Sequence, residues 1–203
     1  MAADPLPRGR SFCVMVGECG TNMAMAAKPS RKPIDQARLD ELALSYVSRY
    51  ATSRAKLKTY LMRKLRERGW VGDCDPPIEA LIERLARLGY VDDRAFALNK
   101  ARSMNARGYG GGRVRQALAQ AGISDEDASE ARELASTEGF AAALRFARRR
   151  SLGPFAPRKP DPRDRQRAIA AMIRAGHAFS LARTIVDLGP GEIPDGDANA
   201  FDK

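Results

Sequence analysis

The chain has 203 residues, of which 44 % are hydrophobic, 6 % aromatic and 30 % charged. That size suits one ordinary domain or two to three small modules with a buried core, and its many alanine, leucine and arginine residues predict an all-α fold. One histidine and an odd set of three cysteines argue against a zinc site with two cysteines and two histidines, and against a disulfide framework. No apolar run reaches the roughly 18 residues of a membrane-spanning helix, so we expect a cytoplasmic protein that holds no metal or other cofactor.

The net charge is the strongest hint of a partner. At pH 7 it is +10, with a sequence pI near 9.9. Such a surface attracts polyanions, of which nucleic acid is the commonest. An acidic protein partner fits the same charge equally well.

The two ends of the chain differ from its middle. Residues 1–35 show no helical period and contain several prolines, so we expect a flexible or spurious leader, with Met15, Met23 and Met25 as alternative translation starts. Residues 190–203 carry four acidic residues against one lysine and predict an acidic, disordered tail.

Residues 36–91 are predicted to form the first of three helical units. Ser53 or Thr52 is expected to cap its second helix, which Gly69 should end, and Gly89 should end the third. Apolar residues recur at steps of three and four, as an amphipathic helix requires: Leu39, Leu42, Ala43, Tyr46, Val47 and Tyr50, then Leu57, Tyr60, Leu61 and Leu65, then Ile78, Leu81, Ile82, Leu85 and Leu88.

The segment LGYVDDRAFA, residues 88–97, places Asp92 and Asp93 side by side. An aspartate at a helix start accepts hydrogen bonds from free amides, and its charge suits the positive end of the helix dipole. No histidine or third carboxylate stands nearby at metal-ligand spacing. We therefore interpret the pair as a cap and a first-turn anion rather than a catalytic or metal site.

Residues 92–136 form the second predicted unit. Its first helix turns Phe96, Ala97, Ala101 and Met104 inward and is broken by RGYGGG. These glycines predict a turn between helices, because neither a preceding strand nor a following Lys-Ser or Lys-Thr supports a phosphate loop. A helix over residues 113–121 follows, and then one opened by Ser124 with Asp127 as a capping box.

A repeat links these segments. KLKTYLMRKLRERGW (residues 56–70) and RVRQALAQAGI (residues 113–123) both place apolar residues at helical steps before a glycine, the first being four residues longer. RAIAAMIRAGHAFSLARTIVDL (residues 167–188) is a third copy, after the leading helix EGFAAALRFARRR. The third unit then spans residues 137–189, and three tandem three-helix repeats predict an elongated, curved array.

The ordered segments LGYVDDRAFA, RGYGGGRVRQALAQAGI and RAIAAMIRAGHAFSLARTIVD together resemble the RecX family of recombination regulators. The resemblance covers nearly the whole repeat region. It implies a non-catalytic, all-α crescent that binds in the groove of RecA recombinase filaments on single-stranded DNA and represses strand exchange, ATP hydrolysis and repressor cleavage. The extra four residues of the first unit and the long loop SLGPFAPRKPDPRD depart from the common pattern.

Candidate contact residues follow the basic charge. Arginine forks suit phosphates and carboxylates alike. For any single residue the solvated face of a helix is the favoured interpretation, but as a group the basic residues exceed what solubility needs. Tyr109, between glycines, is the best exposed aromatic candidate, whereas Trp70, Tyr90 and Phe96 fit core positions. His177 occupies a packing position. The candidates for contact with partner or DNA are Lys56, Arg63, Lys64, Arg102, Arg107, Tyr109, Arg113, Arg115, Arg148, Arg149 and Arg165.

Two functions compete. The resemblance favours a monomeric regulator that binds the RecA filament, and thereby regulates DNA repair, recombination and the SOS response. The charge alone would also fit an autonomous nucleic-acid-binding protein. An enzyme is rejected, because the chain offers no convergent set of nucleophile, base and orienting group.

Overall fold

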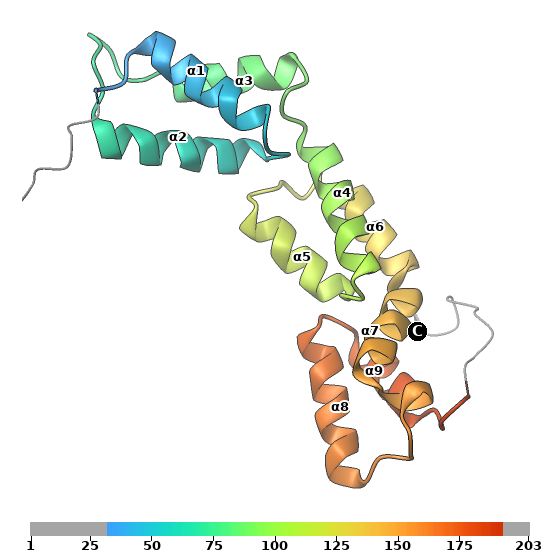
Figure 1. Cartoon of the computed structure of the whole chain (residues 1–203). Helices are drawn as coiled ribbons and strands as arrows, with labels where there is room; N and C mark the ends of the chain where they lie inside the picture. The colour runs from blue at the N-terminus through green and yellow to red at the C-terminus, as the bar shows by residue number, and fades with distance from the viewer. Residues whose placement is uncertain (1–31, 193–203) are drawn as a thin grey trace, which may run out of the picture. The chain divides into compact units, whose positions relative to one another are not determined.

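The computed structural model describes residues 32–192, which fold into nine α-helices and one short 3-10 helix and contain no β-strand (Figure 1). The prediction of an all-α protein is confirmed. Within these residues no helix combines the length and apolar character needed to cross a bilayer.

The first three helices are α1 (Gln36–Val47), α2 (Arg54–Arg68) and α3 (Ile78–Arg87). The hydroxyl of Ser53 caps α2 by accepting from the amide of Lys56 at 3.2 Å, so of the two expected caps Ser53 is the one used. The predicted apolar stripes face one hydrophobic cluster. Two of their members do not: Tyr50 and Leu88 are 58 % and 64 % exposed. Both follow the last residue of their helix, so helical spacing no longer decides which way they point.

The next three helices are α4 (Asp93–Ala106), α5 (Gly111–Gln120) and α6 (Ser129–Thr137). Helix α5 starts two residues earlier than predicted, because Gly111 and Gly112 join its first turn. The hydroxyl of Ser124 accepts from the amide of Asp127 at 3.1 Å and donates to the carboxylate of Asp127 at 2.8 Å, so one of the two bonds of the predicted capping box forms. The two residues close a turn, however, and α6 begins only at Ser129.

The last three α-helices are α7 (Gly139–Arg150), α8 (Pro162–Arg174) and α9 (Phe179–Asp187), with the 3-10 helix η1 (Gly153–Phe155) between α7 and α8. Asp161 caps α8 by accepting from the amide of Asp164 at 2.8 Å, and Pro162 supplies a first residue that needs no amide partner. Helix α9 packs on α7 and α8.

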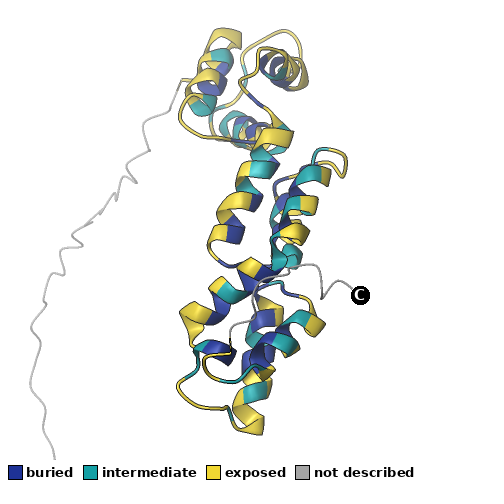
Figure 2. Cartoon of the chain, turned by 90° about the vertical axis from the view of Figure 1, so that its right-hand side faces the viewer, coloured by how far each residue is buried: buried dark blue, intermediate teal, exposed yellow. Residues whose placement is uncertain are grey.

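Each set of three helices surrounds a separate hydrophobic cluster. Figure 2 shows the buried residues on the faces that the helices turn toward one another. We keep three units, over residues 36–91, 92–136 and 137–189, as our proposal for the domain organisation. The predicted leader and acidic tail lie almost wholly outside the described residues.

One joint connects the first and second units around the start of α2. The hydroxyl of Ser53 donates to the carbonyl of Ala121 at 2.6 Å, and the carboxylate of Asp93 accepts from the amide of Arg54 at 2.9 Å. A side chain at Gly122 would meet the Cβ of Ala55 at 2.4 Å. The first turn of α2 is therefore capped by residues of two units.

The other joint, between the second and third units, includes direct hydrogen bonds between main chains. The amide of Gly110 donates to the carbonyl of Ala175 at 3.0 Å, and the amide of Gly112 donates to the carbonyl of Gly176 at 2.9 Å. No Cβ fits between these turns: one at Gly176 would lie 2.2 Å from the nitrogen of Arg113. The glycine-rich turn is thus a contact surface for the third unit.

The variant Gly110→Ala tests this joint. A methyl group at position 110 would lie 2.4 Å from the carbonyl oxygen of Gly176. Because the main chain on both sides is hydrogen-bonded, we expect the free energy of unfolding in urea to fall by about 1–3 kcal/mol, the usual cost of overpacking.

Gly139→Ala is the matched control. Nothing lies within 4 Å of the Cβ that it adds at the start of α7. We expect unchanged stability or a gain of up to about 1 kcal/mol, because alanine loses less entropy than glycine in a helix. Equal stabilities of the two variants would show that the turns do not approach as closely as described.

Candidate functional site

A basic groove runs between α4 and α5 beside the glycine turn. It has a volume of about 200 Å³ and contains three cations and no carboxylate among its lining residues. Three sequence-predicted candidates meet here, with the guanidinium carbon of Arg107 lying 5.9 Å from the ring centre of Tyr109. The lining residues are Lys100, Met104, Arg107, Tyr109, Arg113, Gln116, Ala117 and Gln120.

Lys100 was not among the sequence-based candidates. Lys100 stands on α4 seven residues before Arg107, which follows the last residue of that helix. This spacing is close to two full helical turns, and both side chains line the groove. That spacing is visible in the sequence and would have identified it. Arg102, which was a candidate, is exposed on α4 but does not line this groove.

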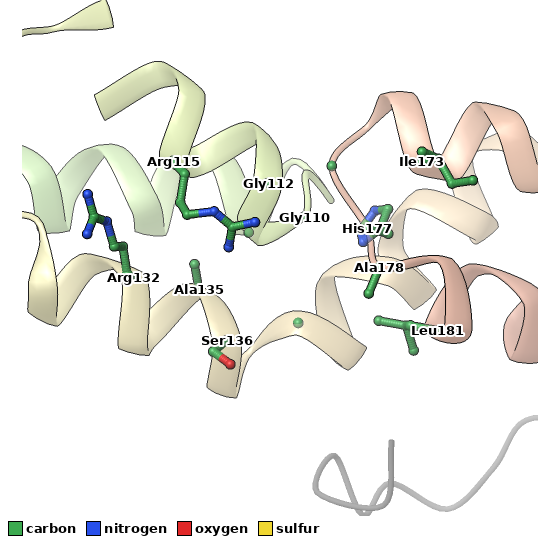
Figure 3. A pocket seen from close by; sticks show the side chains of 13 residues that line it. Gly110, Gly112, Arg115, Arg132, Ala135, Ser136, Ile173, His177, Ala178 and Leu181 are labelled. Atoms are coloured by element: carbon green, nitrogen blue, oxygen red, sulfur yellow. The ribbon is translucent and has the colours of Figure 1, made fainter. Parts of the chain in front are cut away.

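Arg115 lies apart from Arg113, although the two were grouped in the sequence. Residues two apart on a helix point to different sides, and Arg113 donates to Gln116 at 2.9 Å beside the α4–α5 groove. Arg115 instead points from α5 into a second cleft of about 350 Å³, on whose other side His177 and Ala178 lie (Figure 3). The nearby Arg132 is paired with Asp125.

The candidate residues on α2 lie in two different places. The ammonium of Lys56 stands over the ring of Phe96, 4.8 Å from its centre, and so belongs to the joint between units. Arg63 and Lys64 line a third hollow between α1 and α2. Both lie near Glu67, at 3.8 and 3.0 Å.

In the third unit the candidates lie at the basic C-terminal end of α7 and in an ion pair between α8 and α9. Arg148 and Arg149 are exposed in the last turn of α7, where positive charge suits the helix dipole. Arg165, by contrast, donates twice to Asp187 on α9, at 2.5 and 2.6 Å. This bond lowers the pKa of Asp187 and raises the pKa of Arg165. This ion pair connects α8 to α9, and a partner contact of Arg165 stays a prediction.

The two aspartates of LGYVDDRAFA have different partners. Asp92 accepts from the amide of Ala95 at 2.8 Å and caps its own helix. Asp93 is half-buried and accepts from the amide of Arg54, 39 residues away in the chain. Burial raises the pKa of Asp93, although the bond to Arg54 acts in the opposite direction.

His177 is a buried part of the second joint. Its Nε2 lies 3.1 Å from the carbonyl oxygen of Gly108, and because a carbonyl only accepts, Nε2 must carry the proton. Its Nδ1 is buried without a partner among the described residues, and its ring lies 5.6 Å from that of Phe146. Burial lowers the pKa of His177. In the described part of the chain no three His, Cys, Asp or Glu side chains gather as metal ligands would.

Comparison with known proteins places this chain in a family. A family model described as RecX, second three-helix domain, matches residues 92–131. Regulatory protein RecX of Myxococcus xanthus is 33 % identical over 163 residues, which cover 75 % of this chain and 86 % of that protein. The chain belongs to the RecX family. Regulatory protein RecX of Mycobacteroides abscessus is 32 % identical over 161 residues, covering 78 % of this chain and 76 % of that one.

Solved RecX structures share the fold. RecX from Lactobacillus salivarius aligns with a TM-score of 0.54 at 22 % identity, covering 74 % of this chain and 93 % of that one. Another crystal structure of regulatory protein RecX gives a TM-score of 0.53 at 24 % identity, with 74 % and 70 % covered. The resemblance inferred from the sequence is confirmed, and this RecX protein is a regulator rather than an enzyme.

The buried His177 predicts a pH dependence of stability. With a pKa below that of a free histidine, about 6.5, the folded state binds fewer protons than the unfolded state at mildly acidic pH. The contribution of neutral His177 to the free energy of unfolding is therefore complete above about pH 6.5 and is lost as the pH falls through the pKa of the folded state. We expect the free energy of unfolding to decrease between about pH 7 and pH 5.

His177→Gln isolates this effect. Glutamine keeps an N–H for the carbonyl of Gly108 but does not titrate, so the variant should lose less stability over the same pH range in parallel urea titrations. Parallel plots of the free energy of unfolding against pH for the two proteins would contradict this prediction, because they would show that the pKa of His177 is the same in the folded and unfolded states.

Proposed function

We propose that this RecX protein binds RecA recombinase filaments on single-stranded DNA and inhibits their growth, ATP hydrolysis and strand exchange. DNA repair, recombination and the SOS response would be regulated through this inhibition. Membership of the RecX family supports the proposal. Such a partner implies a cytoplasmic protein, and we expect the monomer to be the active form.

The α4–α5 groove is the observation that carries this proposal. All of its lining residues fall within residues 92–131, the segment that matches the family model. Lys100, Arg107 and Arg113 face one hollow without a carboxylate among them. None of the three forms an ion pair with a described residue, and such a cluster suits carboxylates on the recombinase or phosphates of the DNA that it coats.

The direct experiment follows ATP hydrolysis by RecA on single-stranded DNA while this protein is titrated in, with filament length observed in parallel. Inhibition well below one molecule per recombinase subunit would support binding that blocks extension or destabilises filaments. No effect on RecA, together with tight and steeply salt-dependent binding to bare DNA, would leave the competing function, an autonomous nucleic-acid-binding protein.

Two charge reversals on one helix locate the contact. Arg113→Glu places a like charge against an acidic partner surface in the α4–α5 groove. We expect it to raise the half-inhibitory concentration at least tenfold, since like-charge contacts cost several kcal/mol. Arg115→Glu changes the net charge equally but acts in the other cleft, so it should have a much smaller effect.

This pair separates local contact from overall charge. Both residues are exposed on α5, so both variants should fold, which circular dichroism would verify. Equal losses of inhibition would mean that overall charge matters rather than the groove. A greater loss from Arg115→Glu would move the contact to the cleft beside His177.

A further inference from the structure

The first unit has a second kind of basic groove, which is rich in tyrosine. It lies between α1 and α2 and has a volume of about 410 Å³, within the range of about 300–1,000 Å³ for small-ligand sites. Three of the chain's five tyrosines line it, and no lining residue is acidic. The lining residues are Ser45, Tyr46, Arg49, Tyr50, Tyr60, Arg63 and Lys64.

The three tyrosine rings form a platform whose members differ in exposure to solvent. Tyr46 and Tyr60 stack with ring centres 4.2 Å apart and planes 16° from parallel, and both pack against the hydrophobic cluster of the unit. The ring centre of Tyr50 lies 5.4 Å from that of Tyr46 at a tilt of 48°, and Tyr50 follows the end of α1 and is 58 % exposed. Two rings are therefore fixed by the core, while the third offers a free face to solvent.

The charges around this platform remain largely unneutralised. Arg49 is exposed and forms no ion pair with any residue that the structure describes. Arg63 and Lys64 lie 5.7 and 5.8 Å from the centre of the Tyr60 ring. Within residues 32–192 the salt-bridge partner of both is Glu67, so three cations face one described carboxylate.

We propose that this α1–α2 groove is a binding site for single-stranded nucleic acid. A base stacks on the exposed ring of Tyr50, and the phosphates on either side of it meet Arg49 and the Arg63–Lys64 pair. A duplex keeps its bases paired and stacked internally, so it has no base to offer. An acidic peptide would satisfy the cations but would leave the rings unused.

This site is separate from the α4–α5 groove. It lies on other helices and needs no recombinase, so the inference does not rest on the proposed function. The two activities can therefore be lost independently.

The test measures fluorescence anisotropy of labelled oligothymidylate, about 15 nucleotides long to match one binding site, with the full-length protein at low salt. We expect binding that is tighter than to a duplex of the same length. Tyr50→Ala should weaken it roughly 5- to 100-fold, the range for losing one base–aromatic stack, and Tyr50→Phe should restore it.

Tyr90→Ala is the matched control. The core position expected for Tyr90 is wrong, because Tyr90 is 55 % exposed, much like Tyr50, and it lies outside the groove. This variant should bind like the unchanged protein. Arg49→Ala should reduce the log–log salt slope by about 0.7, the value for one phosphate contact on a single strand. Circular dichroism would verify that each variant is folded.

The outcomes distinguish this inference from the proposed function. Equal affinities of Tyr50→Ala and Tyr90→Ala, or equal binding of single strand and duplex, would overturn the nucleic-acid site. Loss of oligothymidylate binding by Tyr50→Ala with RecA inhibition intact would establish the site as a separate activity. Loss of RecA inhibition by Arg113→Glu with oligothymidylate binding intact would show the converse separation.

Discussion

The contact between two main chains at Gly110 and Gly176 is the constraint on which the basic surface depends. Amides at the start of α5 donate to the carbonyls that end α8, and no side chain fits between the two turns. Since α5 starts from this contact, its rotation is set against the third unit. That rotation decides that Arg113 lines the α4–α5 groove and that Arg115 points into the cleft beside His177.

The joint between the first and second units is formed by hydrogen bonds that involve side chains. Free amides at a helix start need acceptors, and in α2 they find Ser53 from their own unit and Asp93 from the next. Ser53 also donates to Ala121, so one hydroxyl serves both units. Polar groups at helix ends thus connect the repeats, and the hydrophobic clusters share no buried residue, although the half-buried Tyr109 packs against two of them.

Local rules predicted most of the helices. Apolar spacing identified the buried stripes, and Gly69 and Gly89, both with positive φ, end α2 and α3 where expected because glycine adopts this conformation without strain. The errors at Tyr50 and Leu88 arise where a helix has just ended and its period no longer applies. The early start of α5 depends on the third unit, because the carbonyl of Gly176 accepts a hydrogen bond from the amide of Gly112.

The candidate sites were predictable only in part. Arg107, Tyr109 and Arg113 are near one another in the chain, and a turn brings them together; Lys100 was recoverable from helical spacing. The partner of Asp93 was not, because Arg54 is 39 residues away and no local pattern encodes that meeting. The stacking of Tyr46 on Tyr60 likewise depends on how α1 packs on α2.

The shared capping at the first joint has a consequence for how such a protein can change during evolution. A repeat whose polar ends are satisfied by its neighbour cannot be deleted or duplicated without leaving an uncapped amide or carbonyl on each side of the cut. Asp93 and Ser53 therefore tie the number of repeats to the identity of single residues at their borders. Gain or loss of a repeat would require matching changes in two places at once, which favours variation in helix length and loops over variation in repeat number.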